Sequence, residues 1–511
     1  MDKATKQLPN DVDALKKIIA DKQQHIHLLE EQLRLERHRQ FGAKSEKHPG
    51  QGELFNEAEQ SADDDTTGAD EAADTETITY TRKKAAGRKP LPEHLPRVRI
   101  EHELPESEQA CPCGCTLSVI GEETSEQLDI IPAKARVLVH VRKKYACRQC
   151  ESGVKTASLP LQPIPKSNAS PGLLAHIAVA KYQDALPLYR QQQIFKRMDI
   201  NLPRNTLASW MMKMGTLVQP LLNLMDDQLL LEPLVHCDET PIQVLKEPDK
   251  PAQSKSYMWV RVSGSPDKRI ILYDYASSRS GEVAKQLFEG YSGYLQTDDY
   301  AGYHAIGKRA EITHLGCWAH ARRKFVEAQK VATPKGSKPK AGKADMALSY
   351  IRKLYGIEKR IKDEPIEVRC ELRQKESLEI LKQFRAWLDN TLHKVLPKGA
   401  LGKALGYLNK NWDKLTIYTE EGCLLMDNNI AENAIRPFVI GRKNWLFSDT
   451  PKGAKASAAL YSLIETAKAN SLEPYAYLRH VFKELPAAKS LEEIEALLPW
   501  NITGESLTIS V

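Results

Sequence analysis

Hydrophobic side chains recur at alternating steps of three and four residues near the start of the chain. The positions are Val12, Leu15, Ile19, Ile26, Leu29 and Leu33, with Lys22 as the one polar break. Such a heptad seam between charged flanks predicts a leucine-zipper-like coiled coil. We place it in residues 1–48, which end in the basic tract RHRQFGAKSEK, and expect it to make the protein a homo-oligomer. An amphipathic helix packed on its own chain would give the same pattern.

A second helical pattern lies in residues 165–230. The segment QQQIFKRMDINLPRNTLASWMMKM predicts one helix that ends near Met198, a turn over 199–202, and a second helix with Pro203 in its first turn. This spacing is typical of a helix-turn-helix region, in which the start of the second helix faces DNA bases or phosphates. An ordinary helical hairpin has the same spacing. The candidate DNA contacts are Arg204, Asn205 and Thr206.

Short apolar runs replace the helical pattern after residue 231. PLVHCDETPIQV, SYMWVRVSG and KRIILYDYA predict three strands of a meander, followed by a helix over 281–289. GYLQTDDYAGY predicts a fourth strand that enters a loop, ITHLGCW a fifth strand, and AHARRKFVEAQK a basic helix. Three strands, a helix and then strands alternating with helices is the order of an RNase H-like sheet. The fold class that we expect is therefore multidomain α/β.

A long helical stretch separates this sheet from the last part of the domain. A Lys/Gly/Pro tract over 330–343 opens a helical region that reaches about residue 415. LLMDNNIAENAIRPFVIGRKNWLF then predicts a helix that starts at Asp427–Asn429. We therefore expect an α/β domain in residues 231–455 with a helical insertion at about 330–420, and a C-terminal helical tail in residues 456–511.

Charge is separated along the chain, although the formal net charge is only +6. Residues 56–76 carry nine acidic side chains and no basic ones, and residues 82–89 carry five basic ones. This composition predicts a disordered acidic and basic linker over residues 49–104. Within it, Arg88 and Lys89 precede a proline, which gives an extended segment that fits the minor groove of A·T-rich DNA. A plain basic linker would have the same sequence.

The chain lacks the signals of export or membrane insertion. No apolar run approaches the ~20 residues that a membrane span needs. The N-terminal sequence MDKATKQLPNDVDAL lacks the basic and then apolar layout of a signal peptide. We therefore expect a cytoplasmic protein with no membrane partner.

Five of the nine cysteines fall within forty residues. In a cytoplasmic chain such a cluster predicts a metal site rather than disulfides. Tetrahedral Zn²⁺ needs four thiolates from two chain segments, so we expect a structural zinc finger in residues 105–155. A site degraded to plain buried thiols is the alternative. CRQC supplies one pair, CPCGC offers three cysteines for two places, and the intervening QLDIIPAKARVLVHVRKKYAC predicts two strands. The ligands are four of the five residues Cys111, Cys113, Cys115, Cys147 and Cys150.

Three acidic residues stand where the predicted elements would bring them to one edge of the sheet. Asp238 ends the first apolar run, Asp298 ends the fourth, and Glu432 lies about one turn into the helix that begins near Asn428. The first and fourth strands are neighbours in an RNase H-like sheet. Turn and capping roles would explain any one of these acids alone, and Glu239 and Asp299 are alternatives to the residues before them.

Gathered carboxylates repel one another unless cations offset their charge. Oxygen ligands suit Mg²⁺, which keeps waters and takes further ligands from phosphate. Two Mg²⁺ (or Mn²⁺) ions about 4 Å apart would activate an attacking hydroxyl and stabilise the leaving oxygen in phosphoryl transfer. The acidic group therefore predicts a two-metal catalytic site.

Basic and aromatic residues follow Glu432 on the same predicted helix. Arg436 is one turn further on and would face the same side, where it could clamp a phosphate. Arg442, Lys443 and Trp445 offer charge and a stacking surface for an exposed DNA end. A core position for Trp445 with solvated basic neighbours is the alternative.

His314, Cys317 and His320 also have the spacing of metal ligands. They straddle a predicted strand-to-helix junction beside the acidic residues. We therefore favour a packing or supporting role for them over a second zinc site.

Several blocks of the chain resemble the insertion-sequence 66 family of bacterial transposases. HCDET, LQTDDYAGY, GCWAHARRKF and DNNIAENAIRPFVIGRKNWLF are similar to the catalytic blocks of that family. FGAKSEK, GRKPLPEHLPR, CPCGC with YACRQC, and LPRNTLASWM are similar to its other modules, in the same order. The likeness extends over roughly residues 10 to 500.

The resemblance implies an RNase H-like DDE domain with a helical insertion between its second Asp and its Glu. It also implies the preceding leucine-zipper-like helix, zinc finger and helix-turn-helix. Matched motif to motif, the catalytic residues fall on Asp238, Asp298 and Glu432. Asp299 departs from the small residue that relatives commonly have after the second Asp.

The function that the resemblance implies is DNA transposition. Such an enzyme binds the terminal inverted repeats of its insertion sequence, exposes 3′-hydroxyls and joins them to target DNA. Accessory proteins of the same element are implied partners, and the nucleoid of a bacterial cell is the implied location. Two alternatives stay open: a metal-dependent nuclease or resolvase that does not join strands, and a domesticated DNA-binding regulator that uses only its zinc finger and helix-turn-helix.

Overall fold

The computed structural model describes residues 135–146, 154–265, 268–332, 342–503 and 507, and scattered positions between 11 and 33. The chain divides into two compact units, one of residues 69–157 and a second that contains everything from residue 158 onward. Arg88, Lys89 and the five cysteines of the predicted finger lie outside the described residues. Among the residues described, no helix combines the length and apolar character needed to cross a membrane.

The described positions from 13 to 33 are helical, in agreement with the predicted N-terminal helix. Four apolar positions of the heptad seam each expose between 51% and 55% of their surface. An exposed seam is what a coiled coil would bury against a second copy, so self-association stays a prediction. These positions are Ile19, Ile26, Leu29 and Leu33.

In the unit of residues 69–157, the structure describes residues 135–146 and 154–157, and these contain one antiparallel strand pair. Strand β1 (Lys144–Ala146) pairs with β2 (Val154–Thr156), with Tyr145 opposite Lys155. The prediction of two strands between the cysteine groups is therefore wrong over residues 135–143, which have no regular structure. The alternation there has no buried face, because Val137, Val139 and Val141 are largely exposed, and a strand gains stability mainly by packing one face.

A five-stranded sheet in the order β5-β4-β3-β6-β7 forms the centre of the second unit. Strands β3, β4 and β5 are antiparallel, and β6 and β7 join the other side of β3 in parallel. The predicted meander and the neighbouring first and fourth strands are both confirmed. The bounds are β3 (Leu234–Gln243), β4 (Lys255–Ser263), β5 (Ile271–Ala276), β6 (Gly293–Gln296) and β7 (Ile312–Leu315), with helix α7 (Gly281–Leu287) between β5 and β6.

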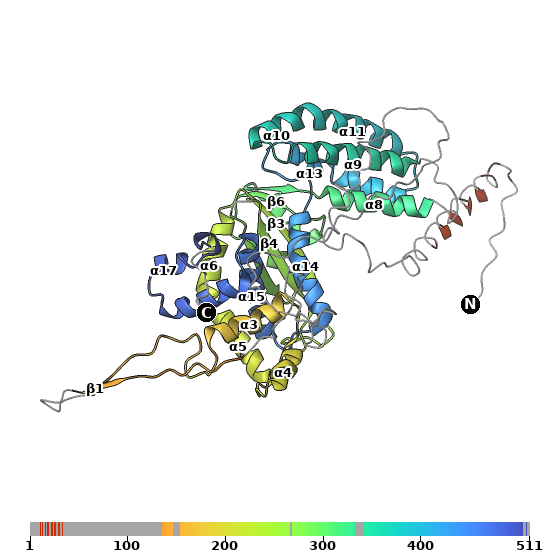
Figure 1. The fold of residues 1–511 in the computed structure, drawn as a ribbon. Helices are drawn as coiled ribbons and strands as arrows, with labels where there is room; N and C mark the ends of the chain where they lie inside the picture. Colours follow the sequence, from red (N-terminus) through yellow and green to blue (C-terminus); the bar gives the residue numbers. More distant parts are fainter. Residues whose placement is uncertain are drawn as a thin grey trace, which may run out of the picture. The chain divides into compact units, whose positions relative to one another are not determined.

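Two late helices pack on this sheet. Helix α14 (Asn429–Trp445) runs beside β3 and β4, and α15 (Pro451–Ala469) lies along β5 and α5 (Arg204–Leu217) (Figure 1). The approach of α15 to α5 requires a glycine, because a Cβ on Gly215 would come 2.7 Å from the Cα of Ala456. The contacts of α14 with β3 and β4 hold this helix along the strand that carries Asp238.

Within residues 158–233, which the structure describes throughout, four helices precede the sheet. The first of the predicted pair ends at Arg197, as expected, and Asp199 makes the turn with a left-handed φ of 57°. Pro203 is the N-cap of the next helix rather than part of its first turn, because its ψ of 143° is extended. Arg204 and Asn205 are exposed at the start of that helix. The helices are α3 (Pro171–Tyr182), α4 (Leu188–Arg197), α5 (Arg204–Leu217) and α6 (Gln219–Leu230).

The predicted insertion is helical and has its own hydrophobic core, to which Trp318 and Phe325 contribute. A π-helical turn (Arg373–Ser377) links two of its helices. After α15, helix α16 (Pro474–Glu484) packs on α3, and α17 (Leu491–Glu495) follows. The helices of the insertion and of its approach are α8 (Trp318–Ala332), α9 (Lys343–Arg360), α10 (Ile366–Leu372), α11 (Leu378–Leu392), α12 (Ala400–Lys410) and α13 (Trp412–Thr416).

Candidate active site

The structure brings Asp238, Asp298 and Glu432 together. Asp238 lies within β3, Asp298 two residues after the end of the neighbouring β6, and Glu432 in the first turn of α14. Burial raises the pKa of Asp238 well above its usual range, and the negative charges of Glu239, Glu432 and Asp298 raise it further. Each of the other two predicted carboxylates is therefore close enough to act on Asp238.

Asn428 fixes the start of α14 against β3. Its Nδ2 donates to the backbone oxygen of Cys237 over 2.9 Å, and its Oδ1 lies 3.1 Å from Nδ1 of His236. The Asn428 side chain is almost completely buried, so these bonds are shielded from water. They place Glu432, one turn further along the helix, beside the strand that carries Asp238.

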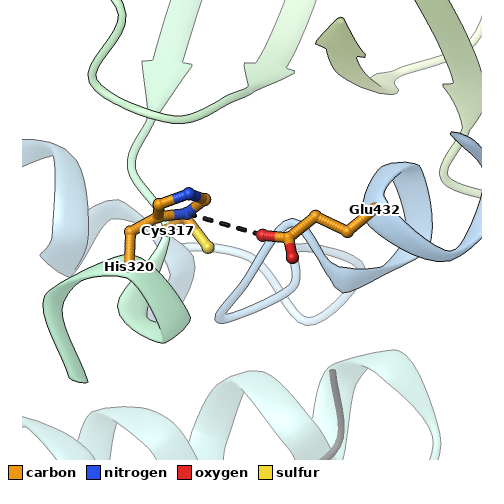
Figure 2. Close-up of side chains that lie close together, drawn as sticks. All are labelled: Cys317, His320 and Glu432. Carbon is orange, nitrogen blue, oxygen red and sulfur yellow. Dashed lines mark ion pairs between the residues drawn. The ribbon is translucent and has the colours of Figure 1, made fainter. Parts of the chain in front are cut away.

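Glu432 is 5% exposed and faces three residues around the start of α8. Arg323 forms an ion pair with its Oε2. His320 places Nδ1 3.5 Å from Oε1, and the Cys317 thiol lies beside them (Figure 2). Oε1 is buried and has no hydrogen-bond partner among the described residues. The carboxylate thus has one neutralised oxygen and one oxygen available to a cation.

Asp238 and Glu239 differ in their surroundings. The Glu239 side chain is buried, pairs with Arg279 and accepts a hydrogen bond from the Tyr303 hydroxyl. Asp238 accepts a bond from the Glu239 amide over 2.9 Å and forms no ion pair with a described residue. Alternation along β3 puts Asp238 on the face of Leu234 and His236, both buried. The geometry favours Asp238 over Glu239 as a metal ligand.

Asp298 and Asp299 are also distinct. Oδ1 of Asp298 accepts a bond from the Tyr300 amide over 2.9 Å, which orients it within the turn. Asp299 pairs with Lys410 of α12 over 2.7 Å and with His304 over 3.4 Å. Burial alone would raise the pKa of Asp299, but its hydrogen bonds and the charge of Lys410 lower the pKa overall. Asp299 is therefore committed to a structural ion pair.

The three carboxylates are of the donor type that divalent cations prefer, although the ligand group whose atoms lie within 4.8 Å of one another among the described residues is Cys317, His320 and Glu432. The carboxylates come from three separate chain segments, and burial, followed by the charges of Glu239, Glu432 and Asp298, raises the pKa of Asp238, a cost that bound cations would offset. Oxygen donors that leave space for water and phosphate are the set that Mg²⁺ prefers. Asp238, Asp298 and Glu432 are thus the residues that could hold the predicted ions.

The other predicted residues on α14 lie along β3 beyond Glu432. Arg436 is half-buried, and Arg442 donates to the Thr240 hydroxyl over 3.1 Å. Lys443 is exposed. The Trp445 ring packs against Phe438, with centroids 5.3 Å apart, and under the Lys181 ammonium at 5.3 Å. Part of its surface is therefore already used in packing, and its stacking on DNA stays a prediction.

His314 does not join the other two residues of the predicted metal-like spacing. Its Nε2 is hydrogen-bonded to the Thr297 hydroxyl at 2.8 Å, and burial lowers its pKa to about 3. This bond ties β7 to the end of β6, just before Asp298. The arrangement agrees with a supporting role for His314, whereas Cys317 and His320 face Glu432.

Sequence reasoning missed the ion pairs that Arg323, Lys410 and Arg279 make with acidic residues of the site. Arg323 had a local signal, because it lies one turn after His320 on a helix already predicted to be basic. Lys410 lies 111 residues from Asp299 along the chain. No local pattern marks a contact over such a separation.

Comparison with known families assigns nearly every part of the chain. A model described as "Transposase IS66 family" matches residues 166–456, and one described as "IS66 C-terminal element" matches residues 462–500. A model of the "zinc-finger binding domain of transposase IS66" matches residues 108–151. A model described as "Transposase C of IS166 homeodomain" matches residues 28–100.

Similar proteins are found in Sinorhizobium fredii (strain NBRC 101917 / NGR234). The uncharacterized protein y4jD is 32% identical over 97% of each chain. The uncharacterized protein y4qI is 32% identical over 82% of this chain and 78% of its own, and y4hP is 30% identical over 83% and 78%.

Proposed function

Because the chain belongs to the IS66 family of transposases, we propose that it cleaves and joins DNA strands with Asp238, Asp298 and Glu432 as its catalytic metal ligands. One observation supports this proposal more than any other. Asp238 lies in β3, Asp298 follows the neighbouring β6, and Asn428 ties the start of the helix that carries Glu432 to β3, although 133 residues lie between Asp298 and Glu432. Three acids gathered over such a distance indicate a built site.

We further propose that the core is RNase H-like. The central strand β3 has antiparallel β4 on one side and parallel β6 on the other. This arrangement supports the proposal because the first and fourth strands lie side by side; Asp238, expected at the end of its strand, lies in the middle of β3, and Asp298 lies two residues after the end of β6. The insertion α9 to α13 then separates these strands from the helix that brings Glu432.

When bound, Mg²⁺ or Mn²⁺ ions would activate the attacking hydroxyl and stabilise the leaving oxygen. The chain's own residues hold and shape the site. Asp238, Asp298 and Glu432 supply oxygen ligands, and Asn428 fixes the position of Glu432 by bonds to β3. Arg436 and Arg442, further along α14, would contact phosphates of the DNA backbone.

The remaining modules would select and align the DNA. Arg204 and Asn205 are exposed at the start of α5, as a recognition helix requires. We propose a helix-turn-helix in residues 165–230, a zinc finger in 105–155 held by four of its five cysteines, and a coiled coil in 1–48 that pairs two copies. Terminal inverted repeats and target DNA would be the ligands.

A strand-joining assay tests the proposal against its enzymatic alternative. The purified chain is incubated with labelled terminal-repeat DNA, Mg²⁺ and a target plasmid, and the products are separated by size. Joined product that requires Mg²⁺ supports a transposase. Cleavage with no joined product would favour a nuclease or resolvase.

Asp238→Ala tests the alternative of a DNA-binding regulator. A transposase loses strand joining with this variant but still binds the terminal repeats, because the DNA-binding modules are elsewhere in the chain. A biological activity that survives Asp238→Ala would show that the acidic site is not used.

A further inference from the structure

We propose that Cys317, His320 and Glu432 form a site for a tetrahedral transition-metal ion such as Zn²⁺, and that an ion bound there withdraws Glu432 from the two catalytic aspartates. The metal site is inferred from the positions of its own residues. Its effect on strand joining rests on the function proposed above.

The three side chains converge from two helix starts. One ligand atom of each lies within 4.8 Å of the others. Cys317 directly precedes α8, His320 lies in the first turn of α8, and Glu432 lies in the first turn of α14. Figure 2 shows the thiol and the imidazole on one side, with the carboxylate pointing toward them. A Cys-x-x-His pair completed by one carboxylate is a set of zinc ligands with a fourth position left open.

The separation of two of these atoms matches tetrahedral coordination. Zinc bonds of roughly 2.0–2.2 Å to nitrogen and oxygen give a tetrahedral N···O edge of about 3.4 Å. Octahedral Mg²⁺ bonds of about 2.1 Å give an edge near 3.0 Å. His320 Nδ1 and Glu432 Oε1 are 3.5 Å apart, so the pair is closer to the zinc geometry.

Both of these atoms are buried, and neither has a hydrogen-bond partner in the part of the chain that the structure describes. A buried polar atom left in this state costs about 1–3 kcal/mol, and one shared cation would satisfy both. Arg323 already neutralises the other oxygen of Glu432. The free oxygen is therefore the one directed at His320 and Cys317.

The donor types select against Mg²⁺. Sulfur and imidazole nitrogen suit Zn²⁺ and Co²⁺, whereas Mg²⁺ prefers oxygen ligands. Metal binding would displace the thiol proton of Cys317 to solvent as the sulfur–metal bond forms. The backbone N–H of Asn428 lies 3.2 Å from Sγ of Cys317 and donates to it, which would stabilise the resulting thiolate. The Asn428 side chain also donates to the backbone of β3 and so holds the start of α14, the helix that carries Glu432.

Cobalt provides a direct test, because a Co²⁺–thiolate bond has its own absorption band. The full-length protein, with its zinc finger loaded with Zn²⁺, is titrated with Co²⁺. We compare the wild type, His320→Asn, and the matched control His480→Asn on α16. The wild type and the control should bind one Co²⁺ with a thiolate band, and His320→Asn should bind it at least tenfold more weakly. Equal titration curves for the wild type and His320→Asn would overturn the proposal.

Cys317→Ser is a second test of the metal site, which applies even if His320→Asn is unstable. It should retain weaker Co²⁺ binding through His320 and Glu432 but lose the thiolate band. A band that persists in Cys317→Ser would place the cobalt at other cysteines and would also overturn the site. Thermal unfolding of each variant in the absence of cobalt shows whether its fold is intact.

Strand joining then separates this inference from the proposed function. Zn²⁺ added to a reaction with excess Mg²⁺ should inhibit the wild type at concentrations that fill the cobalt site. Cobalt binding without such inhibition would overturn the withdrawal of Glu432. Cobalt binding by a wild-type protein that never joins strands in Mg²⁺ would instead contradict the proposed function and leave the metal site standing.

Discussion

Lys410, on helix α12 of the insertion, places its Nζ 2.7 Å from Oδ2 of Asp299, the residue that follows Asp298. The insertion therefore touches the acidic loop directly. It also carries the chain from β7 to the helix that brings Glu432. The packing of the insertion therefore affects the position of two parts of the site: the loop after β6, which carries Asp298, and the start of α14, which carries Glu432.

Lys410→Met should lower strand joining several-fold, because the loop that orients Asp298 loses its anchor. The free energy of unfolding should fall by less than about 1 kcal/mol, since more than half of the Lys410 side chain is exposed. Asp299→Asn should have the same effect. Lys403→Met, an exposed lysine on the same helix, is the control, and equal rates for Lys403→Met and Lys410→Met would contradict the anchoring role.

Arg373 should be the most sensitive position of the insertion. Its fully buried guanidinium pairs with Glu358 over 2.6 Å and donates to the backbone oxygens of Tyr418, Glu421 and Leu424 over 2.7–3.0 Å. Arg373→Met leaves Glu358 uncompensated, at a cost of about 3–5 kcal/mol.

Strand joining should fall with this loss of stability, because residues 418–424 lie shortly before α14, which begins at Asn429 and carries Glu432. Hydrogen exchange of that segment measures the effect most directly. Arg385→Met breaks a surface pair with Asp389 and should change stability by about 0.5 kcal/mol or less. If residues 418–424 of Arg373→Met exchange hydrogen at the wild-type rate, Arg373 does not hold this segment in place.

Two buried histidines should make the protein less stable in mild acid. Burial lowers the pKa of His236 and of His314 to about 3 each. The unfolded chain, with histidine pKa values near 6.5, therefore binds more protons between those limits, and stability falls as the pH drops below about 6.5. From pH 7.5 to 5.5 each histidine should cost about 1.4 kcal/mol.

Denaturant unfolding of His314→Gln at pH 7.5 and pH 5.5 tests whether His314 contributes to the loss of stability in acid. The variant should lose about 1.4 kcal/mol less than the wild type over that interval. His393→Gln, at an exposed position, should behave as the wild type does. Equal pH dependence in His314→Gln and the wild type would rule out His314 as a source of acid sensitivity.

Arg204 should contribute to DNA affinity through counterion release. If it contacts a phosphate, the slope of log K against log salt concentration should become shallower by about 0.9 in Arg204→Ala. Arg360→Ala, in the insertion, should keep the wild-type slope. A slope unchanged in Arg204→Ala would remove this residue from the DNA interface.

The parts of the fold that follow from local pattern could be predicted. Apolar runs such as the one that ends at Asp238 define strands of the sheet, and the Asp427–Asn429 sequence defines the start of α14. Together with the strand order, these local signals were enough to put Asp238 and Asp298 on neighbouring strands or their ends and Glu432 on the helix beside them. They did not predict the irregular residues 135–143, where the alternation is not buried.

The electrostatics around the acids could not be predicted in this way. Whether Asp298 or Asp299 is free depends on where Lys410 comes to lie, and that depends on the packing of a whole helical insertion. The same holds for Glu432, whose neighbours Arg323 and Cys317 lie more than a hundred residues earlier in the chain. Such contacts belong to tertiary packing and leave no periodic signal.

The most direct test of the catalytic assignment compares Asp298→Asn with Asp299→Asn in the strand-joining assay. Both changes remove one charge from adjacent residues and leave side chains of the same size. We predict that Asp298→Asn loses at least about a hundredfold in rate while it binds terminal-repeat DNA as the wild type does, and that Asp299→Asn loses only several-fold. A nearly active Asp298→Asn beside an inactive Asp299→Asn would contradict the assignment.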